Sequence, residues 1–258
     1  MGNFLRIKPF FKRVKRAAPQ HPATRKRGVW RWMKRTFLGL AYLFILTSLF
    51  LVLTFRWAPV PVSSIMAQHW IKATWTGQSS ALRYDWAPYS DISPHAALAV
   101  LAAEDQRFPD HWGVDFVELQ KVLKHIREGR PTRGASTLTQ QVAKNLFLWS
   151  GRSWIRKGLE IWFTVLLEGL WSKQRILEVY LNIAEFGEST FGVEAASRRF
   201  FNKPAAHLTA GEAARLAAVL PNPLRYRVDK PSHYVLKRQR WIERQMRQLG
   251  GVTYLDKL

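Results

Sequence analysis

The chain has 258 residues, of which 47% are hydrophobic and 22% charged, so it can bury one good-sized core, and the composition argues against a disordered or fibrous protein. Its formal net charge of +22 indicates an anionic partner, which could be nucleic acid, an anionic membrane surface or a phosphorylated substrate. The lack of cysteine excludes thiol chemistry and thiolate metal sites.

The N-terminal part of the chain combines a basic arm with an apolar segment. Residues 1–36 carry twelve Lys or Arg and no acidic residue. Residues 37–55 are uncharged and, at about 1.5 Å per residue, are about long enough to cross a hydrocarbon core of roughly 30 Å. We therefore expect an uncleaved transmembrane anchor, with the basic arm in the cytoplasm and the rest of the chain outside. A nucleic-acid-binding tail is the alternative for the arm, but its position beside a membrane span argues against it.

The remainder of the chain predicts one mainly α domain. Residues 56–64 are rich in proline and predict a short extended linker. From residue 65 to residue 258 the apolar residues recur mainly at helical spacing, and period-2 alternation is rare. Capping residues, glycines and prolines set the expected ends of the helices. The expected helices cover about residues 93–107, 136–148, 154–170, 172–184, 209–220 and 232–250.

The first expected helix consists almost entirely of Ala, Leu and Val until it reaches Glu104 and Asp105. We therefore expect it to be buried and to present an acidic pair at its C-terminal end. The negative end of the helix dipole and apolar surroundings both disfavour an ionised carboxyl group, which suits a general base at Glu104. A solvated pair neutralised by Arg107 explains the spacing equally well. In the turn-rich stretch that follows, with Phe108 and His111, a lone histidine is more often structural than catalytic.

The second segment of interest, residues 133–145, joins a glycine-containing loop to a helix rich in hydroxyl and amide groups. Thr137, Gln141 and Lys144 are spaced to line one face of this helix, while leucine and valine line another face that can pack. A helix N-terminus with free N–H groups beside Arg133 is a candidate anion site. A solvated polar face would explain this segment equally well if it stood alone.

The third segment, residues 152–160, places Arg152, Arg156 and Lys157 around Glu160 at the start of an apolar helix. Arg156 and Glu160 are one turn apart and could form a simple ion pair, which contributes little at a protein surface. A glutamate within so apolar a helix is nevertheless more suggestive of a function.

Taken together, these segments resemble the peptidoglycan glycosyltransferase family, whose members stand alone or form the N-terminal module of bifunctional penicillin-binding proteins. Residues 103–115 are similar to the first family motif of Glu-Asp, Phe, His and Gly, residues 134–145 to the second and residues 156–160 to the third. Further similar runs are residues 176–182, 191–197 and 220–223. Several ordered motifs make the resemblance specific. Because few residues follow the last expected helix, the chain resembles the monofunctional members, and we expect no transpeptidase domain.

The resemblance implies a fold, a substrate and a location. The fold is a mainly α, lysozyme-like large lobe with a smaller lobe that dips into the membrane. The substrate is lipid II, a disaccharide-pentapeptide on undecaprenyl pyrophosphate, with the growing glycan chain as donor and lipid II as acceptor. The anchor then lies in the bacterial inner membrane and the catalytic domain in the periplasm. Other cell-wall synthesis and division proteins are possible partners, and nucleic acid is not expected.

The resemblance also implies roles for individual residues. Glu104 matches the base that takes the proton from the acceptor 4-hydroxyl, and the α-linked pyrophosphate is replaced with inversion by a β-1,4 bond. Glu160 matches the second family glutamate, near the donor, while Lys144 and Arg152 match groups that hold the pyrophosphate. The remaining expected residues orient sugar and phosphate oxygens (Ser136, Thr137, Gln141 and Arg133) or hold Glu104 in place (Asp105, Phe108 and His111).

A divalent cation such as Mg²⁺ or Mn²⁺ could bridge the pyrophosphate, but the chain has no Asp-x-Asp pair to hold one. We therefore expect no required cofactor and no protein-built metal site.

Two other functions remain open. A hydrolase or lytic transglycosylase that cleaves the same polymer could share a lysozyme-like fold and one dominant glutamate. The cluster of Arg133, Lys144, Arg152 and Arg156 argues against it, because a glycosidic bond has no anionic leaving group for cations to stabilise. A non-enzymatic, membrane-anchored scaffold of the cell wall would need no buried carboxylate.

Overall fold

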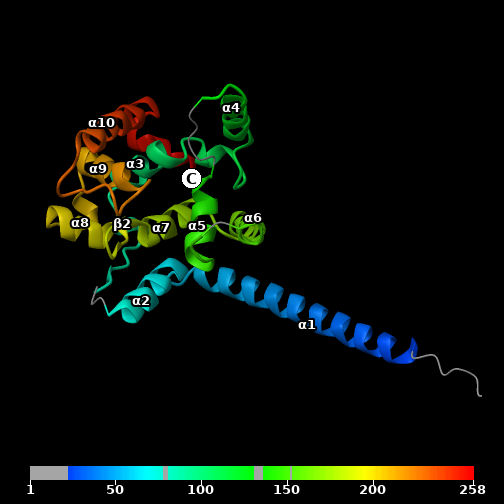
Figure 1. Ribbon diagram of the computed structural model, residues 1–258. Coiled ribbons are helices and arrows are strands. Elements are labelled where there is room, and N and C mark those ends of the chain that lie inside the picture. Colours follow the sequence, from blue (N-terminus) through cyan, green and yellow to red (C-terminus); the bar gives the residue numbers. More distant parts are fainter. Residues whose placement is uncertain (1–22, 78–80, 131–135, 152) are drawn as a thin grey trace, which may run out of the picture. The chain divides into compact units, whose positions relative to one another are not determined.

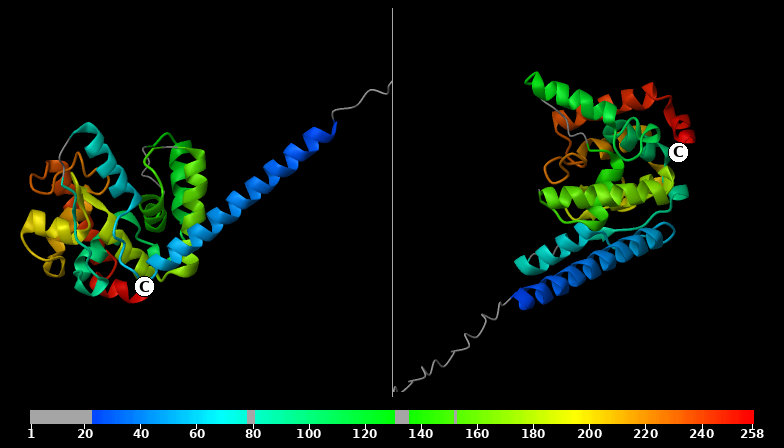
Figure 2. Two further views of the ribbon diagram at one scale, coloured as in Figure 1. Left: turned by 90° about the horizontal axis from the view of Figure 1, so that it is seen from below. Right: turned by 90° about the vertical axis from the view of Figure 1, so that its right-hand side faces the viewer.

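The computed structural model of the chain describes residues 23–77, 81–130, 136–151 and 153–258, which divide after Thr47 into two compact units (Figures 1 and 2). The described part is mainly helical, as the sequence predicts. The α-helices are α1 (Ala23–Phe55), α2 (Ser64–Thr76), α3 (Pro94–Glu104), α4 (Phe116–Arg127), α5 (Leu138–Phe147), α6 (Trp154–Leu170), α7 (Lys173–Ile183), α8 (Val193–Phe201), α9 (Ala210–Val219) and α10 (His233–Gln248). The strands are β1 (Arg83–Tyr84), β2 (Glu185–Gly187) and β3 (Thr190–Phe191), and the 3-10 helices are η1 (Tyr89–Asp91), η2 (Phe108–Asp110), η3 (Ala205–His207) and η4 (Gly251–Lys257).

Helix α1 contains a segment of membrane-spanning length. Its apolar part, Val29–Phe55, is 27 residues long and therefore about 40 Å at about 1.5 Å per residue. Large apolar side chains such as Phe37, Leu43 and Phe50 are exposed, which suits a lipid environment better than a soluble core. The helix begins well before residue 37 because no proline interrupts the basic residues that precede the apolar run. The expected N-terminal helix able to span a membrane is confirmed.

The last turns of α1, from Ser48 on, belong to the second unit and pack within it. The indole Nε1 of Trp171 donates a hydrogen bond of 2.8 Å to the carbonyl of Val52. The guanidinium of Arg175 donates to the carbonyl of Phe55 at 2.8 Å, so it satisfies a carbonyl that the end of the helix leaves without an intrahelical partner. Trp171 is buried, which agrees with core packing as the commonest role of a tryptophan.

The centre of the second unit is helix α3, which packs against α9 and α10, while α5 packs against α6 and α7 (Figure 1). Residues 96–102 of α3 are all buried. The α3–α9 contact is rich in alanine on both helices, and small side chains allow two helix backbones to approach closely. The ends of α3, α5 and α7 therefore meet in a restricted space, where the candidate site lies.

A small sheet in the order β1-β3-β2 fixes the segment that follows α7. Strand β3 pairs in parallel with β1 and antiparallel with β2. The Asn182 amide spans the gap to the chain before α3, accepting from the Ala87 N–H and donating to the Ala87 carbonyl, both at 2.8 Å. Gly192 has φ +85°, and a Cβ there would lie 2.7 Å from the Asn182 carbonyl oxygen, so this close approach requires glycine.

The helix predictions were largely right, with three omissions. Caps were the most reliable signal: Ser153, Ser172 and Ser232 cap α6, α7 and α10. Helix α3 ends at Glu104, three residues earlier than predicted, because Asp105 leaves the helical conformation. The sequence reading missed α2, α4 and α8. In α4 apolar residues recur at helical spacing, at Phe116, Leu119, Leu123 and Ile126, although none of its residues is buried.

Candidate active site

Glu104 is the last residue of α3, and its carboxylate faces a cavity of about 690 Å³. Its Oε2 accepts a hydrogen bond of 3.1 Å from the Gln141 side-chain amide, and its Oε1 lies 3.5 Å from an Nη of Arg238. The expected apolar surroundings are therefore only part of its environment, because both neighbours stabilise a carboxylate. Arg107 pairs with Asp115 at 3.0 Å, so it does not neutralise the acidic pair, as one alternative required.

The wall of this cavity comes from elements far apart in the sequence. Ser136 and Thr137 contribute the loop before α5 and its N-cap, and Glu118 and Lys121 come from α4. Helix α10 contributes Tyr234, Arg238, Trp241 and Gln245 to the wall. Glu104 thus stands as a carboxylate in an accessible, largely polar cavity.

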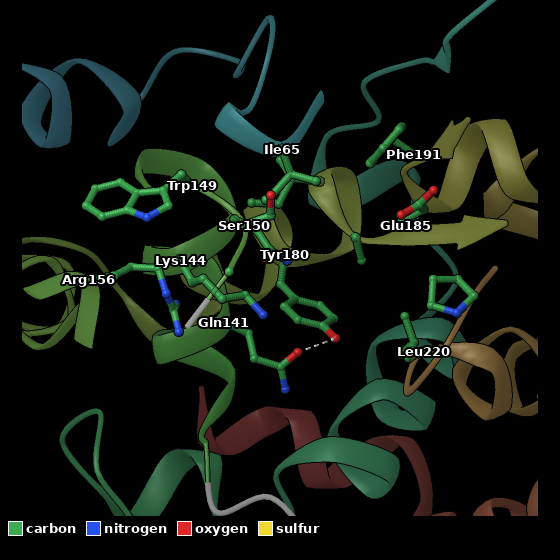
Figure 3. A pocket seen from close by; sticks show the side chains of 15 residues that line it. Ile65, Gln141, Lys144, Trp149, Ser150, Arg156, Tyr180, Glu185, Phe191 and Leu220 are labelled. Atoms are coloured by element: carbon green, nitrogen blue, oxygen red, sulfur yellow. Dashed lines mark hydrogen bonds between the residues drawn. The ribbon is translucent and has the colours of Figure 1, made fainter. Parts of the chain in front are cut away.

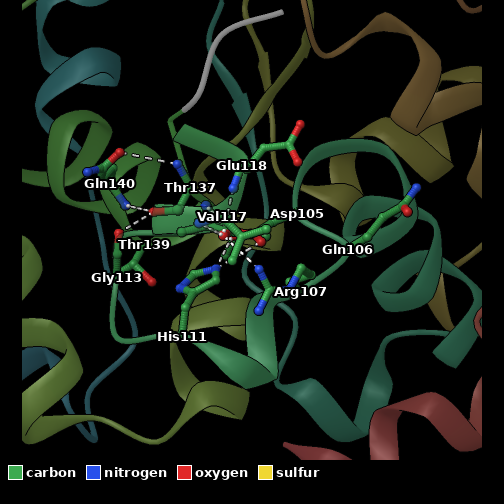
Figure 4. Close-up of polar contacts among 12 residues, drawn as sticks. Asp105, Gln106, Arg107, His111, Gly113, Val117, Glu118, Thr137, Thr139 and Gln140 are labelled. Atoms are coloured by element: carbon green, nitrogen blue, oxygen red, sulfur yellow. Dashed lines mark hydrogen bonds and ion pairs between the residues drawn. The ribbon is translucent and has the colours of Figure 1, made fainter. Parts of the chain in front are cut away.

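Asp105 lines the same cavity and joins α3 to α5 through the contacts drawn in Figure 4. Its carboxylate accepts the backbone N–H of Leu138 at 3.0 Å and lies 2.9 Å from Nε2 of His111. The first N–H of α5, expected from the sequence to help bind a substrate anion, is therefore bound by a carboxylate of the protein itself. This corrects the prediction of an open anion site at the start of α5.

The other expected residues of the first segment, Phe108 and His111, are packed inside the protein. The Lys173 ammonium donates to the His111 carbonyl at 2.5 Å, pairs with Glu168 at 2.9 Å and lies 4.5 Å from the centre of the Phe108 ring. Phe108 and His111 are buried and line neither cavity described here. The hydroxyl of Thr137 donates to the Gly113 carbonyl at 2.6 Å. These contacts hold the segment after Glu104 in place.

A second cavity, of about 450 Å³, is lined by two cations and by one acidic residue, Glu185 (Figure 3). Lys144 and Arg156 line it on the side of Trp149. Burial lowers the pKa of the Lys144 ammonium, and the cations of Arg156 and Lys157 lower it further, against the opposing effects of two carboxylates. A half-buried, partly destabilised cation gains strongly when an anion binds beside it.

Glu160 is buried, lines neither cavity and pairs with two neighbouring cations. Its Oε2 pairs with Arg156 at 3.0 Å, and its Oε1 pairs with Lys157. The ion pair that the spacing predicted is thus present, but its carboxylate is only 4% exposed, so it is not the weak surface pair considered as an alternative.

Gln141 lines both cavities and connects them chemically. Its Oε1 accepts a hydrogen bond of 3.3 Å from the Tyr180 hydroxyl, which leaves its amide nitrogen facing Glu104 (Figure 3). Burial, and then the negative charge of Glu104, raise the pKa of Tyr180 well above its usual value. Tyr180 therefore stays protonated and fixes the orientation of the Gln141 amide.

Some expected residues are not placed, and others were not expected. Arg133 and Arg152 lie outside the described residues. Arg238, Tyr180 and Glu185 line the cavities but were not predicted from the sequence. The basic character of the last helix was a general signal for Arg238, whereas nothing local marked its pairing with a glutamate 134 positions earlier in the chain.

The chain is similar to known proteins over most of its length. Residues 71–247 match the family model described as Transglycosylase. The chain is also 55% identical over 230 residues to proteins named biosynthetic peptidoglycan transglycosylase, from Yersinia pseudotuberculosis serotype O:3 (strain YPIII) and Yersinia pestis (strain Pestoides F), covering 88% of this chain and 94% of each relative.

The chain belongs to the transglycosylase family. A transglycosylase moves a glycosyl group to an acceptor, so the chain is a glycosyltransferase. The family model covers α3 to α9 and nearly all of α10, and thus every residue named above in the two cavity walls. The resemblance found in the sequence motifs is thereby confirmed.

Proposed function

We propose that the chain polymerises lipid II into β-1,4-linked peptidoglycan strands and releases undecaprenyl pyrophosphate. One observation carries the proposal: a carboxylate in one cavity and a pair of cations in the next are joined by Gln141, which lines both. Glycosyl transfer from a pyrophosphate needs these two features side by side, because an attacking hydroxyl must lose a proton while the leaving pyrophosphate gains a further negative charge that must be stabilised.

Glu104 is the proposed base. In the reaction the acceptor 4-hydroxyl oxygen forms a bond to the donor anomeric carbon, the bond from that carbon to the pyrophosphate oxygen breaks, and the hydroxyl proton passes to Glu104. Attack from the side opposite the α-linked pyrophosphate inverts the configuration to β. The contacts from Gln141 and Arg238 support this role, since they fix the direction of the carboxylate.

Lys144 and Arg156 are the proposed pyrophosphate ligands. Both line the second cavity, and Glu160 orients Arg156 from behind through its ion pair. Arg152, outside the described residues, is proposed to join them because it matches a family position for pyrophosphate binding. Cations that stabilise charge developing on the leaving group contribute more in the transition state than in the ground state.

The cation pair also argues against the two rival functions. Hydrolysis or lytic cleavage of a glycosidic bond requires a carboxylic acid near the leaving oxygen and leaves Lys144 and Arg156 without a task. A scaffold protein has no need to bury Lys144 in a cavity at a cost in free energy.

The proposal requires no metal ion. In the described residues no group of three His, Cys, Asp or Glu side chains is placed to bind one. The carboxylates of Glu104 and Glu160 are engaged by Arg238 and by Arg156 with Lys157. A Mg²⁺ or Mn²⁺ ion that accompanied the pyrophosphate would therefore depend mainly on phosphate oxygens for its ligands.

We further propose that α1 crosses the bacterial inner membrane once, with residues 1–36 in the cytoplasm and the second unit in the periplasm. The support is the exposed apolar helix together with the basic arm before it. This arrangement would put the second unit on the same side of the membrane as its proposed lipid-linked substrate. Other proteins of cell-wall synthesis and division are proposed partners because the family resemblance implies them.

Formation of glycan from labelled lipid II by the detergent-solubilised full chain tests the proposed function. We expect β-1,4 polymer and free undecaprenyl pyrophosphate, with and without a chelator. Shortening of preformed glycan, without polymerisation, would establish the lytic function instead. Absence of both reactions, together with binding to glycan, would favour the scaffold.

Lys144→Ala is expected to lower kcat/KM for lipid II by about 10- to 100-fold, because a hydrogen bond to a charged group contributes about 1.5–3 kcal/mol. The lowered pKa of Lys144 gives a second signature. Its ammonium is present below that pKa and is lost as the pH rises through it, so wild-type kcat/KM should fall at a lower pH than an ordinary lysine would produce.

Lys144→Arg should retain part of the activity and lose this alkaline fall, because arginine stays charged. The matched control is Lys124→Ala, an exposed cation on α4 outside both cavities. Measurement of kcat/KM from pH 7 to pH 10 checks both effects. Near-normal kcat/KM in Lys144→Ala would contradict the assignment.

A further inference from the structure

Glu185, the first residue of β2, lines the cavity that contains Lys144 and Arg156. Figure 3 shows it on the side of the cavity opposite Arg156, with Gln141 and Tyr180 between them. The roles proposed above do not use it. A carboxylate beside two cations would normally pair with one of them, yet Glu185 forms no ion pair with either.

Glu185 has no close charged partner among the described residues. Its Oε2 lies 3.7 Å from Nε2 of His69, which is longer than a hydrogen bond. Burial, and then the charge of Lys72, lower the pKa of His69, so this imidazole is neutral near pH 7 and supplies little compensating charge. The other carboxyl oxygen, Oε1, is buried and has no hydrogen-bond partner in the part of the chain that the structure describes.

The environment favours the neutral carboxyl group. Burial, assisted by the charge of Glu188, raises the pKa of Glu185 to about 7, against a smaller opposing effect from the backbone of Ser189. The other charged or titratable groups on the surrounding elements are engaged elsewhere or lie across the cavity. They are His69 and Lys72 on α2, Tyr180 on α7, the Glu194–Arg198 pair and Arg199 on α8, the Lys203–Glu212 pair and Arg215 at α9, and Lys144 and Arg156 across the cavity.

Binding of the substrate strengthens the preference of Glu185 for its neutral form. If the pyrophosphate occupies the cavity beside Lys144 and Arg156, an ionised Glu185 would place a further negative charge in the same cavity as a dianion. Like charges in a partly buried site disfavour each other, so the complex favours the protonated carboxyl. A protonated carboxyl is a hydrogen-bond donor, and its natural partner is an uncharged oxygen.

We propose that Glu185 is a substrate-positioning residue that donates, in its neutral form, a hydrogen bond to an uncharged oxygen of the substrate next to the pyrophosphate. The inference rests on the proposed function, because it assumes a pyrophosphate substrate in this cavity. The oxygen belongs either to the donor sugar or to the phosphate–lipid ester, which share this chemistry. Glu185 takes no part in bond making or breaking; it acts on the affinity for the donor.

The expected result is a pH dependence of KM that Glu185→Gln removes. The wild-type KM for lipid II should be constant below about pH 7 and rise above it by up to about tenfold per pH unit, because binding then requires uptake of one proton. The amide of Glu185→Gln donates a hydrogen bond without titrating, so its KM should stay flat from pH 6 to pH 8. Glu185→Ala should raise KM throughout, with kcat little changed.

The matched control is Glu188→Gln, in the exposed turn next to β2, which should keep the wild-type shape of the profile with a midpoint moved slightly to lower pH. The titration of Lys144 is common to all of these variants, so the difference between the wild-type and Glu185→Gln profiles isolates Glu185. Identical profiles for wild type and Glu185→Gln would overturn the inference. If wild type makes no glycan at any pH, the proposed function itself fails.

A second measurement does not depend on the folding of a Glu185 variant. Binding of lipid II to Glu104→Gln, in which turnover is blocked, can be followed by calorimetry at pH 7.5 in buffers of different ionisation enthalpy. We expect net uptake of roughly 0.8 proton, the fraction of ionised Glu185 that must be protonated. Absence of uptake would overturn the inference. Undecaprenyl pyrophosphate, which has no sugar, distinguishes the two possible sources of the oxygen. If both ligands cause proton uptake but Glu185→Ala weakens the binding of lipid II alone, the oxygen belongs to the sugar.

Discussion

Replacement of Glu104 by Gln is expected to lower polymerisation of lipid II by about 10³-fold, within the range of about 10²–10⁴ typical for loss of a general base. Glutamine has nearly the same shape but cannot accept the hydroxyl proton. The side chain lies in a cavity wall, 16% exposed, so its loss should leave the fold intact.

The Glu104 experiment compares glycan formed by wild type and variant from the same labelled lipid II, together with thermal unfolding of both. The control is Glu118→Gln, which lines the same cavity from α4 and pairs with Lys121 at the surface. It should keep near-normal activity. Near-normal turnover in Glu104→Gln, at an unchanged melting temperature, would show that another group takes the proton.

Replacement of Glu160 by Ala is expected to destabilise the fold by about 3–5 kcal/mol, because removal of one partner leaves buried cations uncompensated. Arg156 is only 12% exposed, and Lys157 shares the same carboxylate. Activity should fall as a consequence, since Arg156 would lose the group that orients it. Glu160→Gln, which keeps the shape and one acceptor, should be affected less in both respects.

A rescue experiment separates this structural role from a chemical one. Added pyrophosphate should raise the melting temperature of Glu160→Ala more than that of wild type, because the anion replaces the missing charge near Arg156. Glu118→Ala, which removes a surface partner of Lys121, should change stability by less than about 1 kcal/mol. If Glu160→Ala kept the wild-type melting temperature and still lost turnover, Glu160 would act in the chemistry itself.

The sequence predicted those features that depend on residues close together in the chain. Thr209 and Glu212 form the expected capping box of α9, and Thr137 caps α5 with Gln140. The buried face of α5 followed from its apolar spacing. The acidic pair at the end of α3 was also placed correctly, although the helix ends earlier than expected.

Features that depend on distant segments were missed or misjudged. Asp105 binds the first N–H of α5 across 33 positions, and no local pattern announced that this helix start would be occupied. Arg238 comes from α10, which local spacing marks only as a basic helix. Glu185 follows α7 as an ordinary glutamate, and only its burial on the cavity wall distinguishes it.

Gln141 also bears on inhibition and resistance. Because this one side chain lines both cavities, a compound anchored by a phosphate group at Lys144 needs to extend only past the Gln141 amide to contact Glu104. Such an inhibitor would compete with donor and acceptor at once. A bacterium that escaped it by exchanging Gln141 would remove the hydrogen-bond donor that directs its own catalytic carboxylate, so that resistance by this route should carry a loss of growth.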